Sequence, residues 1–230
     1  MRPDGSEQQQ VLQLPGEILT PAESPDTRSV AFTFTSAQTH VSEVWVAQAD
    51  GSLPHKLVGA SRSATTRSGQ SIQGAVHPSW SPDGGSIAFA STDSGRFEVG
   101  TMASDGSAAH QLIDGSGGGY PDSNVPEYSL DGTGITYWSG YESQYGEVWI
   151  MAADGSGQRR LTDTPDPESA DNPTWSPDGR FVVFISNRAP AGPQPTTGVN
   201  AWVVAAGGGE PRMLLQNVSY CAWAPAEAGR

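Results

Sequence analysis

Residues 77–91 read HPSWSPDGGSIAFAS, and this stretch decides the fold because the chain repeats it. NPTWSPDGRFVVFIS at 172–186 is a close copy, and VPEYSLDGTGITYWS at 125–139 is a looser one. PAESPDTRSVAFTFTS at 21–36 is looser still, and CAWAP at 221–225 keeps only the beginning of the motif. The copies recur at intervals of roughly 50 residues, and such a period is typical of a stacked or circular array of structural repeats.

A second motif follows each of the first four copies. It reads EVWVAQADGSLPHKLV at 43–58, EVGTMASDGSAAHQLI at 98–113, EVWIMAADGSGQRRLT at 147–162 and, in a worn form, NAWVVAAGGGEPRMLL at 200–215. Each repeat therefore contains four short apolar runs rich in β-branched and aromatic residues, which suit strands and are too short for helices. Asp-Gly pairs between the runs are a strong hairpin signal because both residues tolerate a positive φ. Four antiparallel strands in a repeat of this length form the blade of a β-propeller.

The combined pattern, WSPDG…IAF…EVWxMxADGSGxxRLT, resembles the repeat of the TolB-like, WD-repeat-like family of β-propellers over nearly the whole chain. Related blades occur in the propellers of prolyl oligopeptidases and in oligogalacturonate lyases. The resemblance implies the fold specifically and the function only weakly, because one fold hosts many kinds of site. It also implies a periplasmic or other extracytoplasmic location. The first residues, MRPDGSEQQQVLQL, show no apolar signal-peptide core, so a cytoplasmic location stays open.

We expect a single all-β domain over residues 1–230, a β-propeller of four complete four-stranded blades. YCAWAP near the C-terminus resembles the first strand of a fifth blade, and QQQVLQL near the N-terminus resembles its last strand. Pairing of the termini closes many propellers, whereas the six blades usual in TolB-like rings favour an open arc that is part of something longer. TolB itself carries a further N-terminal domain that we do not find in this sequence, so its Tol–Pal partners are not implied. The expected blades are 21–73, 78–122, 126–169 and 173–218, with 1–14 and 219–230 as the partial blade.

The net charge of −13 makes nucleic acid and anionic membranes unsuitable as main partners, since phosphate binding requires concentrated Lys and Arg. No apolar run approaches the ~20 residues of a membrane-spanning helix. The one cysteine, Cys221, lies in an apolar strand motif, and we interpret it as a buried structural thiol.

The two faces of the predicted propeller differ. The short Asp-Gly turns lie on one face, and the long connections lie on the other, where binding residues are usually found. These connections are the crossovers 59–76, 114–124 and 163–171 and the within-blade loops 36–42, 91–97, 139–146 and 187–200.

Polar residues precede the innermost strands, where the crossovers meet the mouth of the central channel. Together they could hold a cation, a peptide terminus or another polar ligand, or they could simply cap strand starts and bind channel water. On the loop 139–146, beside Trp138, the aromatic residues Tyr141 and Tyr145 are candidates for an interface with a partner. The predicted channel residues are Gln73, His77, Asp122, Asn124, Asp171, Asn172 and Tyr220.

The repeated aromatic residues have a structural interpretation. We expect Trp80, Tyr128, Trp175 and Trp223 to pack between neighbouring blades. Trp45, Trp149 and Trp202 share a position in the third strand, where the second blade has Gly100. The missing indole removes apolar burial and predicts a softer second blade, unless a loop fills the gap.

The sequence contains no G-x-S-x-G elbow, H-E-x-x-H helix, Walker loop or C-x-x-C pair. Of the four histidines only His77 falls where a site could form, so the sequence predicts neither a metal site nor a cofactor. We therefore expect a non-catalytic scaffold that binds a protein or peptide, with possible self-association through open blade edges. Two alternatives stay open: a propeller lyase or hydrolase that uses His77 with Asp122 and Asp171, and a gating domain for a prolyl-oligopeptidase-like enzyme.

Overall fold

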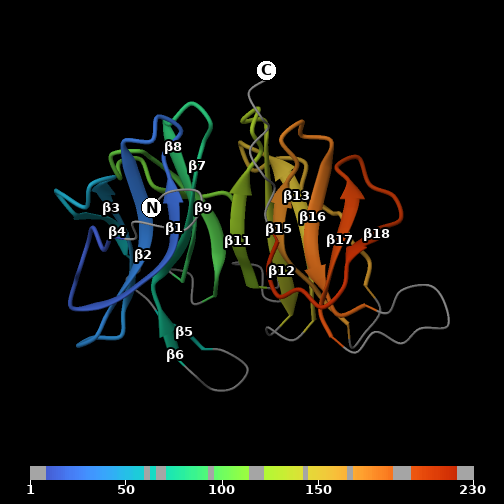
Figure 1. Ribbon diagram of the computed structural model, residues 1–230, viewed down its shortest axis with the longest axis horizontal. Helices are drawn as coiled ribbons and strands as arrows, with labels where there is room; N and C mark the ends of the chain where they lie inside the picture. The colour runs from blue at the N-terminus through green and yellow to red at the C-terminus, as the bar shows by residue number, and fades with distance from the viewer. Residues whose placement is uncertain are drawn as a thin grey trace.

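The computed structural model describes residues 9–59, 63–65, 71–92, 96–113, 122–141, 145–164, 168–188 and 198–221. Four antiparallel four-stranded sheets stand side by side in an unclosed arc, which confirms the predicted open propeller (Figure 1). The described residues contain no helix, and accordingly none that could cross a membrane.

Each sheet is one blade, and its strands pair in chain order from the innermost to the outermost. The first sheet contains β1 (Gly16–Glu23), β2 (Ser29–Ser36), β3 (Ser42–Gln48) and β4 (His55–Gly59). The second contains β7 (Ala75–Trp80), β8 (Ser86–Ser91), β9 (Glu98–Ala103) and β10 (His110–Gln111). The third contains β11 (Asp122–Tyr128), β12 (Gly134–Tyr141), β13 (Tyr145–Ala152) and β14 (Arg159–Arg160). The fourth contains β15 (Ala170–Trp175), β16 (Phe181–Ser186), β17 (Asn200–Ala205) and β18 (Arg212–Leu215).

The Ser-Pro-Asp-Gly segments form the turns between the first and second strands. Ser81 Oγ donates a hydrogen bond of 2.6 Å to Asp83 Oδ1, and Gly84 N–H donates to the carbonyl of Ser81. Gly84 alone takes the left-handed conformation (φ 71°), whereas the sequence pattern suggested that both residues of an Asp-Gly pair could take it. The same serine–aspartate bond, also 2.6 Å, recurs in the other three sheets: Ser24–Asp26, Ser129–Asp131 and Ser176–Asp178. The SPDG aspartates are therefore turn residues, as predicted.

Two of the connections are more regular than the sequence suggested. The crossover from the first to the second sheet contains a separate hairpin, β5 (Ser63–Thr65) and β6 (Ser71–Gln73), which stands apart from the four sheets (Figure 1). The predicted loop 139–146 is mostly strand, because β12 and β13 stay paired as far as Tyr141 and Tyr145. Polar and small residues at these positions hid the continuing strands.

Tryptophan side chains join neighbouring sheets, as predicted. Trp80 Nε1 donates to the carbonyl of Ala22 in the first sheet at 3.0 Å, and Trp175 Nε1 donates to the carbonyl of Glu127 in the third at 3.2 Å. An apolar cluster lies in each of the three spaces between sheets, and these clusters form the core of the domain. Tyr128 belongs to the cluster between the second and third sheets, whereas Trp223 lies outside the described residues.

Segments near the two termini cover the outer faces of the arc. Leu12 and Leu14 pack on Phe32 and Phe34 of the first sheet. At the other end, Val218 and Cys221 pack on a cluster of the fourth sheet that contains Val183, Ile185, Ala201 and Val203. Residues 9–14 form no strand, and residues 1–8 and 222–230 lie outside the described part of the chain, so the partial fifth blade stays a prediction.

The N-terminal segment nevertheless lies where a fourth strand of a preceding sheet would lie. The carbonyl of Val11 stands against Gly51, in the outer Asp-Gly turn of the first sheet. The carbonyl of Leu57 in β4 stands in the same way against Gly106 of the second sheet, and that of Leu112 against Gly155 of the third. This agrees with the likeness of QQQVLQL to the last strand of a blade.

Candidate functional site

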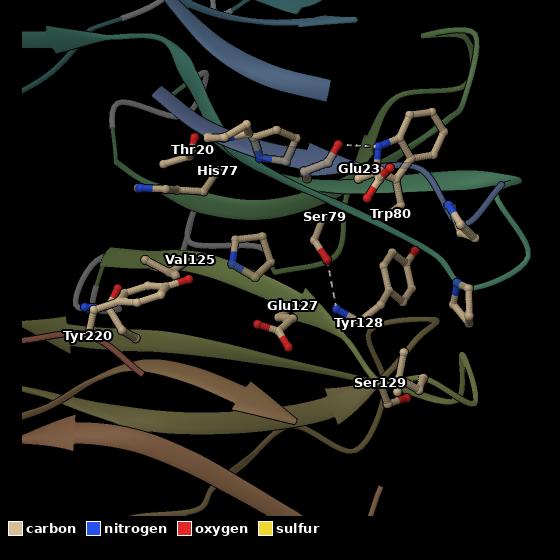
Figure 2. Close-up of a pocket in the computed structure, with 18 residues that line it drawn as sticks. Thr20, Glu23, His77, Ser79, Trp80, Val125, Glu127, Tyr128, Ser129 and Tyr220 are labelled. Carbon is tan, nitrogen blue, oxygen red and sulfur yellow. Dashed lines mark hydrogen bonds between the residues drawn. The ribbon is translucent and has the colours of Figure 1, made fainter. Parts of the chain in front are cut away.

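A cavity of about 930 Å³ lies along the innermost strands and is the candidate site (Figure 2). Its walls come from β1, β7 and β11, together with Asn172 of β15 and Tyr220. Pro25, Pro82, Ser129 and Leu130, in the turns that follow these three strands, also line it, so the cavity extends toward the face that carries the Asp-Gly turns. Prolines and the aromatic rings of Trp80 and Tyr128 supply apolar surface, and a few polar side chains lie between them. This combination is typical of ligand sites in proteins. We refer to it as the central cavity.

A repeated backbone irregularity directs one side chain of each innermost strand into the central cavity. Thr20, His77, Val125 and Asn172 each precede a proline and have a positive φ of 46–54°. The register of each strand shifts at this place by a β-bulge. Bulges re-aim side chains, and all four of these residues line the cavity. The left-handed conformation is unfavourable for residues other than glycine, most of all for β-branched ones, so local strain accompanies this arrangement.

His77 is the best-supported of the predicted channel residues. Its Nδ1 lies 2.8 Å from Asn124 Oδ1 of the neighbouring sheet. Because that oxygen also accepts the N–H of Val125, the imidazole donates through Nδ1 and Nε2 is left as an acceptor. Burial lowers the pKa of His77, while the hydrogen bond to Asn124 and the negative charge of Asp171 oppose the change. His77 is therefore a neutral hydrogen-bonding group at neutral pH.

Some of the other predicted channel residues lie at the central cavity or beside His77, and Asp122 has a different role. Asn172 and Tyr220 line the central cavity, and Asp171 lies close enough to His77 for their charges to interact. Burial raises the pKa of Asp171, opposed by the backbone N–H of Asn172 and by His77. Asp122 instead accepts the N–H of Phe97 at 3.1 Å and so closes the loop before β9.

The remaining predictions lie apart from the central cavity. Gln73 belongs to the β5–β6 hairpin, where it pairs with Ser63, and it is not among the residues that line the cavity. Tyr145 is 41% exposed and pairs with Tyr141 across β12 and β13, which leaves it available for a contact. The side chain of Tyr141 lies outside the described part of the chain.

Glu127 is a functional candidate that the sequence analysis missed. Its Oε1 accepts hydrogen bonds from the Thr174 hydroxyl at 2.8 Å and from the backbone N–H of Trp175 at 3.2 Å. Burial raises the pKa of Glu127 to about 6, although these two hydrogen bonds act in the opposite direction. The sequence does distinguish Glu127, because the other three repeats have smaller, uncharged residues at this position: Ala22, Ser79 and Thr174.

Residues near the C-terminus approach this carboxylate. Tyr220 lines the central cavity, and Figure 2 shows it on the same side of the cavity as Val125. Burial and the negative charge of Glu127 raise the pKa of the Cys221 thiol to about 11. The thiol is half-buried and protonated at neutral pH, which agrees with a structural role.

The central cavity is negatively charged. Glu23 and Glu127 are among the residues that line it, and none of these residues is Lys or Arg. In the described part of the chain no group of three His, Cys, Asp or Glu side chains is arranged to hold a metal ion. The chemistry of the cavity is therefore that of a hydrogen-bonding and anionic site with apolar walls.

Comparison with known proteins agrees with this fold. TolB of Bordetella pertussis, a Tol-Pal system protein, is 30% identical over 155 residues, which are 66% of this chain and 31% of that protein. The structure of TolB from Acinetobacter baumannii aligns with a TM-score of 0.68 at 20% identity, over 93% of this chain and 47% of that one. A puromycin-hydrolyzing peptidase from Mycobacterium tuberculosis aligns with a TM-score of 0.63 at 15% identity, over 94% of this chain and 31% of that one.

The chain thus spans less than half the length of each of these three proteins. The two structural likenesses are below 25% identity and establish the fold alone. The family assignment rests on a broader match, because the family described as the TolB beta propeller domain matches residues 3–226. The chain belongs to the TolB β-propeller domain family.

Proposed function

We propose that this chain is a non-catalytic scaffold of the cell envelope that binds a protein or peptide at the central cavity and on the long-loop face. The observation that carries the proposal is the cavity itself, about 930 Å³, with His77, Asn172, Glu127 and Tyr220 beside prolines and aromatic rings. The similarity to a Tol-Pal system protein supports a protein partner and a periplasmic location.

The charge of the central cavity suggests which part of a partner would bind. Carboxylates without neighbouring basic groups favour a cation, and a partly desolvated carboxylate attracts one more strongly than an exposed carboxylate does. Glu127 keeps one oxygen, Oε2, that is not used by Thr174 or Trp175. The amino terminus of a peptide, or a Lys or Arg side chain, has the charge that this site requires.

The test is selection of peptides from a random phage-displayed library, followed by calorimetric titration of the enriched peptides. We expect peptides with a basic group beside apolar residues, and at least tenfold weaker binding to the Glu127→Gln and His77→Gln variants. Asp178→Asn, a turn carboxylate of the fourth sheet, is the matched control and should bind like the wild type. Selected peptides that bind all four proteins equally would refute the central cavity as the site.

A second candidate function is the gating domain of a peptidase. It is favoured by the likeness to the puromycin-hydrolyzing peptidase, which covers 94% of this chain. In that case a serine hydrolase that reacts with a fluorophosphonate probe should co-purify with the chain, and its turnover of large substrates should change when the chain is removed. A scaffold should bind its partner without any turnover, both as the wild type and as the Asp171→Asn variant.

The location and the self-association are tested separately. Cell fractionation should place the native protein in the envelope fraction. Light scattering after size exclusion should show a concentration-dependent mass if the open ends of the arc associate.

A further inference from the structure

One position breaks the symmetry of the four sheets. In three of them an aromatic residue of the second strand pairs with a tryptophan of the third strand. In the second sheet Phe89 pairs instead with Gly100. The three complete pairs are Phe32–Trp45, Tyr137–Trp149 and Phe184–Trp202.

Each of these indoles fills the side of its sheet that faces the preceding part of the chain. Trp149 packs against the second sheet in a cluster with Val99 and Leu112, and its ring stacks on Tyr137 with centroids 6.4 Å apart and planes at 27°. Trp202 is 4% exposed and packs against the third sheet. An indole at position 100 would therefore lie between the second sheet and the first.

The structure has a cavity of about 360 Å³ at this place. Val58 of β4 contributes its wall on the first sheet, and Phe89 and Gly100 contribute the wall on the second. Ser91 of β8 and the exposed residues Ala109, His110 and Gln111 complete the lining, so the cavity opens to solvent and has polar groups beside its apolar surface. We call it the Gly100 cavity.

The chain cannot easily fill this space from position 100. A Cβ atom at Gly100 would lie 2.7 Å from the carbonyl oxygen of His110, a separation that real Cβ atoms do not show. A larger residue would therefore have to displace β10. A side chain on β9 therefore cannot fill this space, whereas a group from outside the protein can enter it.

We propose that the Gly100 cavity is a binding site for a planar aromatic group of the size of indole. An aromatic ring there would stack near Phe89 as Trp149 stacks on Tyr137, and it would remove apolar surface from water. The ring can belong to a small molecule or to the tryptophan side chain of a partner, and this site is independent of the central cavity.

The test uses two probes, free indole and N-acetyl-tryptophanamide, titrated into the intact protein by calorimetry. We expect saturable binding with one site per chain. Binding of indole alone indicates a small-molecule ligand, and binding of the amide at equal or higher affinity indicates a tryptophan side chain; both results support the site.

A blocking variant locates the binding. Ala109→Trp places an indole in the Gly100 cavity from its exposed rim, and it should raise the dissociation constant of both probes at least tenfold while the far-UV spectrum is unchanged. Gln158→Trp makes the same change at the equivalent position of the third sheet, where Trp149 already occupies the space, and should leave probe binding unchanged. Absence of saturable binding to the wild type, or equal binding to Ala109→Trp, overturns the proposal.

If Ala109→Trp does not fold, Trp149→Gly gives an independent measurement. It creates the corresponding space in the third sheet and should raise the stoichiometry from one probe to two. A stoichiometry that stays at one in a folded Trp149→Gly variant also counts against the proposal.

Discussion

Glu127 and Thr174 occupy the same position of neighbouring innermost strands, and the Thr174 hydroxyl donates a 2.8 Å hydrogen bond to Glu127 Oε1. The carboxylate thus joins the third sheet to the fourth and at the same time lines the central cavity. Two effects on the pKa of Glu127 oppose each other, because burial favours the protonated acid while the hydrogen bonds from Thr174 and Trp175 favour the carboxylate.

The raised pKa of Glu127 predicts that the stability of the fold depends on pH. The pKa of Glu127 is raised from 4.5 to about 6, so the folded state binds more protons than the unfolded state between these values, and the free energy of unfolding falls as the pH rises through this window. Glu127→Gln should remove this contribution, which is about 2 kcal/mol. Urea unfolding from pH 4 to pH 7 measures it. Equal pH profiles of the two proteins would contradict the assignment.

The pKa of His77 should depend on its burial and on its neighbours Asn124 and Asp171. Because burial lowers its pKa below 6.5, the unfolded state takes up the proton first, and this residue reduces stability as the pH falls below 6.5. Asp171 opposes the effect, so Asp171→Asn should lower the pKa of His77 further. An NMR titration of the imidazole measures the shift, with Asp178→Asn as the control that leaves it unchanged. A rise in the pKa in the Asp171→Asn variant would show that their charges do not interact as described.

The residue type at the positive-φ position of each innermost strand should affect the stability of the fold. Val125 has φ 52°, which is unfavourable for a β-branched residue, whereas Asn172 holds the equivalent place with φ 48° and tolerates it. Val125→Asn should therefore raise the free energy of unfolding, by about 1 kcal/mol. The reciprocal change, Asn172→Val, should lower it. Urea unfolding of both variants tests the prediction, and a destabilised Val125→Asn would mean that packing outweighs strain there.

The cover of the first sheet should contribute to stability. The double variant Leu12→Ala/Leu14→Ala exposes Phe32 and Phe34 and should lower the free energy of unfolding by about 2 kcal/mol. Leu53→Ala, at a leucine that is 73% exposed, is the control and should have little effect. Thermal unfolding and binding of a hydrophobic dye measure both variants. Equal stabilities would indicate that residues 9–14 do not protect this face.

The sequence predicted the features that local chemistry determines. The serine–aspartate turns recur because each depends on residues at most five positions apart, such as Ser81, Asp83 and Ser86. Trp80 and Trp175 reach neighbouring sheets because their places in the repeat fix their direction. The four sheets follow from these two signals together.

Features that depend on neighbouring sheets were harder to predict. Bulges turn Thr20 and His77 into the central cavity, and Thr20 was not recognised although it precedes a proline, as His77 does. Asp122 was placed at the channel, but it accepts the N–H of Phe97 because β11 starts beside the loop before β9. The missing indole at Gly100 was visible in the sequence, but only the structure shows the cavity that remains.

Val11, Leu57 and Leu112 each stand against the outer Asp-Gly turn of the sheet that follows, so the contact between one sheet and the next is made by the end of the preceding unit. A tandem copy of one whole unit, inserted in frame between the second and third sheets, would then supply its own contact to the next sheet. The segments that cover the two outer faces of the arc would stay unchanged. Family members with different numbers of blades could arise by this route, in single genetic steps and without redesign of either end.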